Sequence, residues 1–185
     1  MRIGKFIREE CGKYFTLADI SLLEIGIGGG TFGRILSPYV KKYYGIDINE
    51  GMVRGAVQNS SGAAVNYAVG DAERIPFGRN FDIVFYSRSW HLLEHYSKAL
   101  AEADRVLKHG GVIVIAEPSK NSNRWKDARL IKGSPQFDEE DLIEKMESLE
   151  RGRDALFEQR LFNVSGMLYY EGAVYLLKRK ISWER

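Results

Sequence analysis

The segment from Leu22 to Thr31 constrains the fold more than any other part of the chain, because a short apolar run leads directly into a cluster of glycines and then a helix-like stretch. Glycine is favoured where the backbone adopts a positive φ or where a ligand lies against the chain. A helix that begins at such a turn presents free backbone N–H groups, and in an open α/β sheet this edge forms the ligand crevice. A plain turn needs fewer glycines than this segment holds, which are Gly26, Gly28, Gly29 and Gly30.

Apolar runs and helix-like stretches alternate along the chain up to about residue 118. The expected strands span 21–25, 43–48, 65–69, 81–86 and 112–117, and the expected helices span 31–41, with an interruption near Pro38, 50–58 and 96–107. Because these strand runs are almost continuously apolar, we expect a parallel sheet covered by helices on both faces. The fold class is therefore α/β, a doubly wound Rossmann-like sheet, in a single domain over residues 1–185.

The last third of the chain has a different pattern. It predicts an amphipathic helix over 138–149 and two strands at about 155–164 and 173–180. No helix-length segment separates these two strands, so we expect them to pair as an antiparallel hairpin at one edge of the sheet.

The composition excludes several classes of function. The formal net charge of +2 gives no overall attraction to nucleic acid or to an anionic membrane. Cys11 is the only cysteine, which excludes an intrachain disulfide and the cysteine-rich zinc and iron–sulfur sites, and we expect no metal. No apolar run approaches the roughly 20 residues of a membrane-spanning helix, and the first residues lack the apolar core of a signal peptide. We therefore expect a cytoplasmic protein without a membrane partner.

Three acidic residues lie close to the expected ligand edge. Glu24 precedes the first glycine by two residues, Asp47 ends the second strand, and Asp71 follows the third. A carboxylate at the end of the second strand can accept both hydroxyls of a ribose. The stretch from Gly28 to Gly33 fits the dinucleotide pattern G-x-G-x-x-G, but Glu24 would repel a pyrophosphate. A ligand that carries an ammonium group and no phosphate suits this acid better.

The spacing of Glu24, Gly26, Gly28 and Gly30 resembles motif I of the class I S-adenosylmethionine-dependent methyltransferases. The run 70–84 resembles their adenine-binding and motif II region, and 105–112 resembles their turn before the fifth strand, with His109 in place of the usual proline. The similarity covers about residues 20–118 and is greatest to the small "type 11" group, which includes quinone-biosynthesis and tRNA-wobble methyltransferases. The resemblance implies a seven-stranded sheet whose last strand is antiparallel.

The resemblance also implies the cofactor and its contacts. S-adenosyl-L-methionine is the expected cofactor and S-adenosyl-L-homocysteine the product. Asp71 is expected to receive the exocyclic amine of adenine, and the backbone N–H of Ala72 is expected to reach a ring nitrogen. The full set of expected cofactor-binding residues is Glu24, Gly26, Ile27, Gly28, Gly30, Asp47, Ile48, Asp71, Ala72 and Ser87.

His91 is the candidate general base, because it follows the fourth strand at the mouth of the crevice and a neutral imidazole can take up a proton. The alternative is a structural histidine that packs on Trp90 or bonds to the backbone. Trp90 and Tyr86 could likewise face a flat or cationic substrate or pack in the core. Residues 1–18 are expected to form a helix that could act as a lid, with Tyr14 and Phe15 as contact points.

The acceptor is expected to be a small molecule, since no separate RNA-binding domain is visible. RNA, particularly tRNA, is the second candidate, because the possible substrate loop 119–137 contains the basic segment Lys120–Lys132. Two other classes stay open: a NAD-dependent oxidoreductase that uses Gly28 to Gly33, and a non-catalytic binding subunit with a methyltransferase fold. The oligomeric state is expected to be a monomer or a homodimer.

Overall fold

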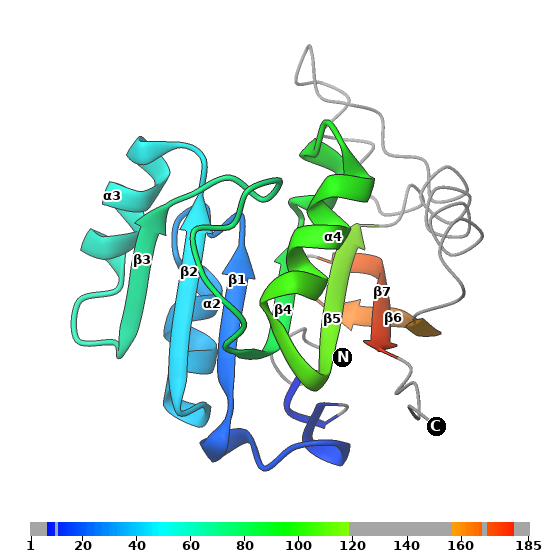
Figure 1. The fold of residues 1–185 in the computed structure, drawn as a ribbon. Coiled ribbons are helices and arrows are strands. Elements are labelled where there is room, and N and C mark those ends of the chain that lie inside the picture. The colour runs from blue at the N-terminus through cyan, green and yellow to red at the C-terminus, as the bar shows by residue number, and fades with distance from the viewer. Residues whose placement is uncertain (1–6, 10, 119–156, 168–169, 180–185) are drawn as a thin grey trace.

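One sheet with the strand order β3-β2-β1-β4-β5-β7-β6 organises the computed structural model, which describes residues 7–9, 11–118, 157–167 and 170–179 (Figure 1). The first five strands are parallel to one another. They are β1 (Ser21–Ile25), β2 (Lys42–Asp47), β3 (Val65–Val69), β4 (Phe81–Ser87) and β5 (Leu107–Pro118). β7 (Tyr170–Arg179) pairs in the antiparallel direction with both β5 and β6 (Phe157–Met167).

Helices cover both faces of the parallel strands. α4 (Tyr96–Val106) lies in front of the sheet in Figure 1, and α2 (Thr31–Leu36) lies behind it. α3 (Glu50–Asn59) follows β2, and Asn49 caps it by accepting hydrogen bonds from the amides of Gly51 (2.8 Å) and Met52 (3.2 Å). None of the described helices has the length and apolar character needed to cross a membrane.

The two faces carry separate buried clusters. On the α4 side, Ala99, Leu100 and Ala103 pack against apolar side chains of β1, β4 and β5. On the opposite side, Ile7 and Cys11 join Leu36 against the other face of the sheet. Because β1, β4 and most of β5 are buried on both faces, their sequences are nearly continuous apolar runs.

The order of the strands fixes where a ligand can bind. From β1 the chain moves outward through β2 to β3 and then returns to β4 on the other side of β1. The connections therefore diverge between β1 and β4, and the carboxyl ends of the parallel strands leave a crevice at this switch point.

The α/β Rossmann-like class and its parallel sheet, expected from the sequence, are confirmed. β1 and β3 have the predicted bounds. The predicted helix 31–41 is shorter, because α2 ends at Leu36 and a 3₁₀ turn that contains Pro38 follows over Ser37–Tyr39. Pro38 cannot donate a helical hydrogen bond, which accounts for the early end.

The start of β5 was predicted wrongly. The sequence predicts a strand from residue 112, whereas β5 already begins at Leu107, which pairs with Phe81 of β4. A register shift between Phe81 and Ile83 accommodates the glycines of this stretch. The predicted helix 138–149 and the loop 119–137 lie outside the described residues.

Candidate functional site

The glycine loop between β1 and α2 is shaped by backbone conformations that other residues rarely adopt. Gly26, Gly28 and Gly30 have φ values of 78°, 49° and 73°. A Cβ on Gly26 would collide with the side chain of Ser89, whereas a Cβ on Gly28 would meet nothing within 4 Å. Gly26 is therefore required for packing inside the protein, and Gly28 leaves an open surface against which a ligand can lie.

Asp47 joins this loop to the start of α3. Its Oδ2 accepts a hydrogen bond from the Gly28 amide at 3.0 Å, and its Oδ1 accepts one from the Asn49 amide at 2.9 Å. Each carboxylate oxygen has two lone pairs, so each keeps one acceptor position for a ligand hydroxyl. The cap of α3 is Asn49 and not Asp47.

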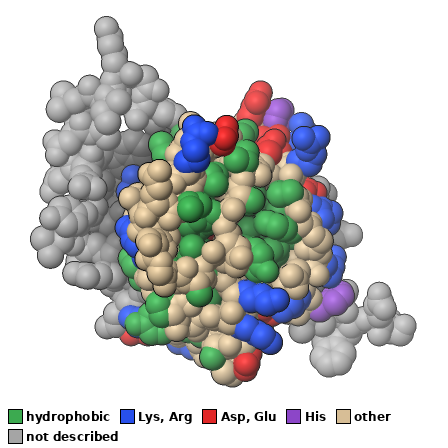
Figure 2. All heavy atoms as spheres, turned by 90° about the vertical axis from the view of Figure 1, so that its left-hand side faces the viewer, with side chains coloured by type: hydrophobic (Ala, Val, Ile, Leu, Met, Phe, Trp, Pro, Cys, Tyr) green, Lys and Arg blue, Asp and Glu red, His purple; other side chains and the backbone are tan. Residues whose placement is uncertain are grey.

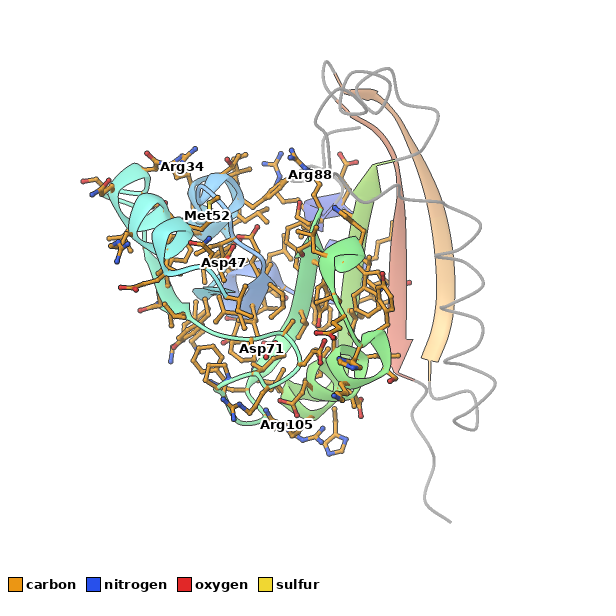
Figure 3. The ribbon with its side chains drawn as sticks, turned by 90° about the horizontal axis from the view of Figure 1, so that it is seen from above. Arg34, Asp47, Met52, Asp71, Arg88 and Arg105 are labelled. Atoms are coloured by element: carbon orange, nitrogen blue, oxygen red, sulfur yellow. The ribbon has the colours of Figure 1, made fainter. Side chains whose placement is uncertain are left out.

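Asp71 lies in a tight turn after β3. Its Oδ1 accepts the amide of Glu73 at 2.8 Å, and its carbonyl accepts the amide of Arg74 at 3.1 Å. Ala72 is buried beside it. This turn follows β3 at the same sheet edge as the end of β2, and Figure 3 shows Asp47 and Asp71 from above that edge.

The loop that carries Asp71 is held by side chains of α4. Glu102 accepts the Ile75 amide at 2.8 Å, and Arg105 donates to the carbonyls of Phe77 (2.7 Å) and Ile75 (2.8 Å). Arg105 also pairs with Glu102 at 2.7 Å. At the other end of α4, the amide and Nδ1 of His95 both lie within 2.9 Å of the Glu73 carboxylate.

Exposed apolar side chains flank the two acids. Ile48, Met52 and Val69 are 73%, 49% and 51% exposed. Figure 2, which faces the β3 and α3 side of the molecule, shows hydrophobic side chains gathered there. Apolar surface beside two carboxylates suits a ligand with a flat ring and polar edges.

Glu24 is buried rather than exposed at the loop. It is 1% exposed, and the Tyr43 hydroxyl donates to its Oε2 at 2.6 Å. Burial raises the pKa of Glu24 to about 8; the Tyr43 hydrogen bond opposes this shift and the nearby charge of Asp47 adds to it. The carboxyl group is therefore mostly protonated at neutral pH.

Ser87, the last residue of β4, is buried, and its Oγ has no hydrogen-bond partner among the described residues. In contrast, Ser89 donates from its Oγ to the Ile25 carbonyl at 2.6 Å and links the loop after β4 to β1. Buried polar groups in folded proteins are almost always hydrogen-bonded, so the hydroxyl of Ser87 indicates a place for a ligand atom.

Comparison with known proteins assigns the family. The family model whose description is "Methyltransferase domain" matches residues 23–115, which include the glycine loop, both acids and Ser87. The chain belongs to this family. This match agrees with the class I, S-adenosylmethionine-dependent type that the sequence motifs predict.

Curated relatives match about 60% of the chain. It is 30% identical over 115 residues to the phthiotriol/phenolphthiotriol dimycocerosates methyltransferase 1 of Mycobacterium ulcerans, across 60% of this chain and 42% of that protein. It is 35% identical over 121 residues to a ubiquinone/menaquinone biosynthesis C-methyltransferase of Cupriavidus metallidurans, across 58% of this chain and 49% of that protein. The chain thus spans less than half the length of these curated relatives.

Among solved structures, an S-adenosylmethionine-dependent methyltransferase from Aquifex aeolicus has the same fold, with a TM-score of 0.68. Its sequence is 24% identical, and the match covers 96% of this chain and 91% of that one.

The family match also argues against the oxidoreductase alternative. In the methyltransferase, Gly33 lies against the Tyr67 side chain, so the last glycine of the dinucleotide pattern serves packing.

The remaining predicted cofactor residues of the methyltransferase lie at the same edge. Ile27 is buried against Val53 and Ala56 of α3, and Gly30 precedes α2. Both residues lie in the loop between β1 and α2.

His91 lies in a 3₁₀ turn (Trp90–Leu92) after β4 and is partly exposed. Trp90 and Tyr86 are fully buried, with ring centroids 4.8 Å apart, and therefore belong to the core rather than to a substrate surface. Tyr14 and Phe15 pack against the buried cluster behind the sheet. Residues 1–6 and the basic segment Lys120–Lys132 lie outside the described part of the chain.

Sequence reasoning missed the residues that hold the Asp71 loop. The roles of Glu73 and Glu102 were not visible in the sequence, because Glu73 accepts from His95, 22 positions away, and Glu102 accepts from the Ile75 amide, 27 positions away. Arg105 begins the stretch 105–112 that resembles a known motif, and this was the only sign of its importance in the sequence. The motif does not reveal that Arg105 binds the carbonyls of Phe77 and Ile75.

Proposed function

We propose that this methyltransferase transfers a methyl group from S-adenosylmethionine to a small-molecule acceptor. The observation that carries the proposal is the row of groups along one sheet edge: Asp71 after β3, Asp47 at the end of β2, the glycine loop after β1 and Ser87 at the end of β4. This row presents acceptors for an adenine amine and a ribose diol, and then an open backbone surface.

Each part of the row suits one part of the cofactor. Asp47 would accept both ribose hydroxyls with its remaining lone pairs, and Asp71 with the Ala72 amide would bind the edge of adenine. Ile48, with its exposed side chain, would cover the adenine ring. Glu24 would act indirectly, because its hydrogen bond to Tyr43 joins β1 to β2 within the core.

When bound, S-adenosylmethionine supplies a methyl group on a positively charged sulfur that is ready for in-line displacement. The protein's main contribution is then alignment of the acceptor with that methyl group. His91 is the proposed general base for an acceptor whose proton is not lost readily, because it follows β4 at the same edge.

Similarity to curated relatives supports the proposed acceptor class. The curated relatives carry names that refer to dimycocerosates and to quinone biosynthesis, which supports a small-molecule acceptor. An RNA acceptor, bound through Lys120–Lys132, is the second candidate. The seven-stranded sheet with an antiparallel last strand is part of the same proposal, and the pairing of β7 with β5 supports it.

Calorimetric titration of the purified protein tests the cofactor assignment. We expect S-adenosylmethionine and S-adenosylhomocysteine to bind and NADH not to bind. Asp47→Ala should weaken both by about 100-fold or more, because two hydrogen bonds to a charged group are lost. Asp19→Ala is the matched control, since Asp19 is exposed and precedes β1 at the opposite end of that strand. Binding of NADH alone, or of none of the three, would contradict the proposal.

Transfer itself requires a second measurement. Protein incubated with S-adenosylmethionine carrying a radioactive methyl group should label a low-molecular-weight fraction of a cell extract. Label in the RNA fraction would support the second acceptor class. Cofactor binding without label in either fraction would identify a non-catalytic binding subunit.

A further inference from the structure

Arg88, which directly follows β4, has a backbone conformation that an arginine rarely adopts. Its φ is 57°, and it is the one non-glycine residue in the described part of the chain with a positive φ. Its amide donates to the Ala116 carbonyl of β5 at 2.9 Å, so the strained residue is anchored between two strand ends. Residues that keep such a conformation are concentrated at functional sites.

The guanidinium group of Arg88 is exposed and forms no hydrogen bond or ion pair with the described residues. Other arginines near the crevice bind the protein's own carbonyls, as Arg34 does with Gly29 and Arg105 with Ile75 and Phe77. Arg88 thus holds a positive charge at the ligand edge that the fold itself does not use.

The position of Arg88 relative to Asp47 and Asp71 indicates which part of a ligand it would meet. Figure 3 shows Asp47 between Asp71 on one side and Arg88 on the other. The strand order β3-β2-β1-β4 places the expected adenine and ribose sites over β3 and β2. A ligand that continues along this edge then passes the glycine loop and reaches Ser87, with its unpaired buried hydroxyl, and Arg88.

We propose that the Arg88 guanidinium binds the α-carboxylate of the methionyl part of the cofactor, an inference that rests on the proposed function. This carboxylate is the only anionic group of S-adenosylmethionine, and it lies at the end of the molecule away from adenine. The planar guanidinium presents two N–H groups that match the two oxygens of a carboxylate.

A pair of ligands separates this role from a general effect on the site. S-adenosylhomocysteine contains the amino-acid carboxylate, whereas 5′-methylthioadenosine has the same adenine, ribose and sulfur without the amino-acid part. In calorimetric titrations, Arg88→Gly should weaken S-adenosylhomocysteine by about 10- to 100-fold. The affinity for 5′-methylthioadenosine should change by less than about twofold.

Glycine is the informative substitution because it accepts a φ of 57° without strain. The urea midpoint of Arg88→Gly should therefore stay level or rise, so a loss of affinity cannot come from unfolding. Arg88→Lys should retain part of the affinity for S-adenosylhomocysteine. Arg54→Ala is the matched control, since it removes one positive charge from an exposed pair with Glu50 and should leave both ligands unaffected.

Three outcomes would overturn the inference. If Arg88→Gly weakens both ligands equally, Arg88 shapes the site and does not bind the carboxylate. If neither ligand changes, the charge serves another molecule such as the acceptor. If the unmodified protein binds neither ligand, the proposed function fails and the inference fails with it.

Discussion

The two loops on either side of the end of β2 are positioned by different kinds of interaction. The glycine loop, residues 26–30, owes its shape to positive φ values and to close approach of buried side chains. The loop after β3, residues 70–80, is held by polar side chains of α4, mainly Glu102 and Arg105. The difference shows that one wall of a crevice can be fixed by backbone sterics and the other by hydrogen bonds.

The two kinds of interaction respond differently to change. Steric contacts in a packed interior fail abruptly when volume is added. Hydrogen bonds of partly exposed side chains weaken gradually with pH and salt, because solvent screens them. The glycine loop should therefore be sensitive to substitution and insensitive to salt, whereas the β3 loop should show the reverse.

The largest effect should come from Gly26→Ala. The new Cβ would meet the Ser89 side chain, and alanine disfavours a φ of 78°. We expect the free energy of unfolding to fall by about 3 kcal/mol or more, measured by urea denaturation. Gly28→Ala is the matched variant, because its Cβ meets nothing within 4 Å. It should cost about 1–2 kcal/mol from backbone strain alone, while weakening cofactor binding.

The effect of pH on stability should be the next largest, and it should differ between β1, which carries Glu24 and leads into the glycine loop, and the loop after β3. Glu24 has a pKa of about 8 when folded and an ordinary value of 4.5 when unfolded, so the folded state binds an extra proton between these values. Its contribution to stability is complete below pH 4.5, falls as the pH rises and is lost above about 8. The slope approaches roughly 1.4 kcal/mol per pH unit. In urea unfolding at several pH values, Glu24→Gln should flatten this decline.

Glu102, on the other wall, has the opposite dependence. Its pairing with Arg105, the main cause, holds the pKa of this carboxyl group below its usual value. The stability it contributes is present above that usual value and is lost as the pH falls through the lowered one. If the free energy of unfolding of Glu24→Gln fell at high pH as much as that of the unmodified protein, the decline could not be assigned to Glu24.

The smallest effect should come from Arg105→Met, which keeps the apolar stem and removes the bonds to Ile75 and Phe77. We expect a loss of about 1–2 kcal/mol in unfolding free energy, since the head group is partly exposed. Cofactor affinity should fall as well, because the turn that holds Asp71 is released. An unchanged affinity would mean that this loop is positioned without α4.

The sequence predicted the elements whose cause is local. The bounds of β1 follow from an apolar run that ends in glycine, and the cap at Asn49 follows from its side chain. Asp47 and Asp71 were proposed as site residues because they lie at or just after strand ends, where ligands bind in parallel α/β sheets.

What depends on distant contacts could not be predicted. Nothing near Arg88 in the sequence indicates a positive φ, because arginine has no preference for that conformation and the amide of Arg88 bonds to Ala116 on a distant strand. Burial of Glu24 depends on Tyr43, which the chain brings alongside only when β1 and β2 pair. For the same reason, Trp90 and Tyr86 could not be assigned to the core before the position of α4 was known.

The two hydrogen bonds that Asp47 accepts from main-chain amides affect the entropy and the rate of ligand binding. Because the Asp47 side chain already holds the amides of Gly28 and Asn49, the glycine loop loses little conformational entropy when a ligand binds. Association at this part of the edge then amounts to docking on a rigid surface, with a rate set by diffusion and orientation instead of loop closure. Discrimination between cofactor analogues would accordingly appear in their dissociation rates.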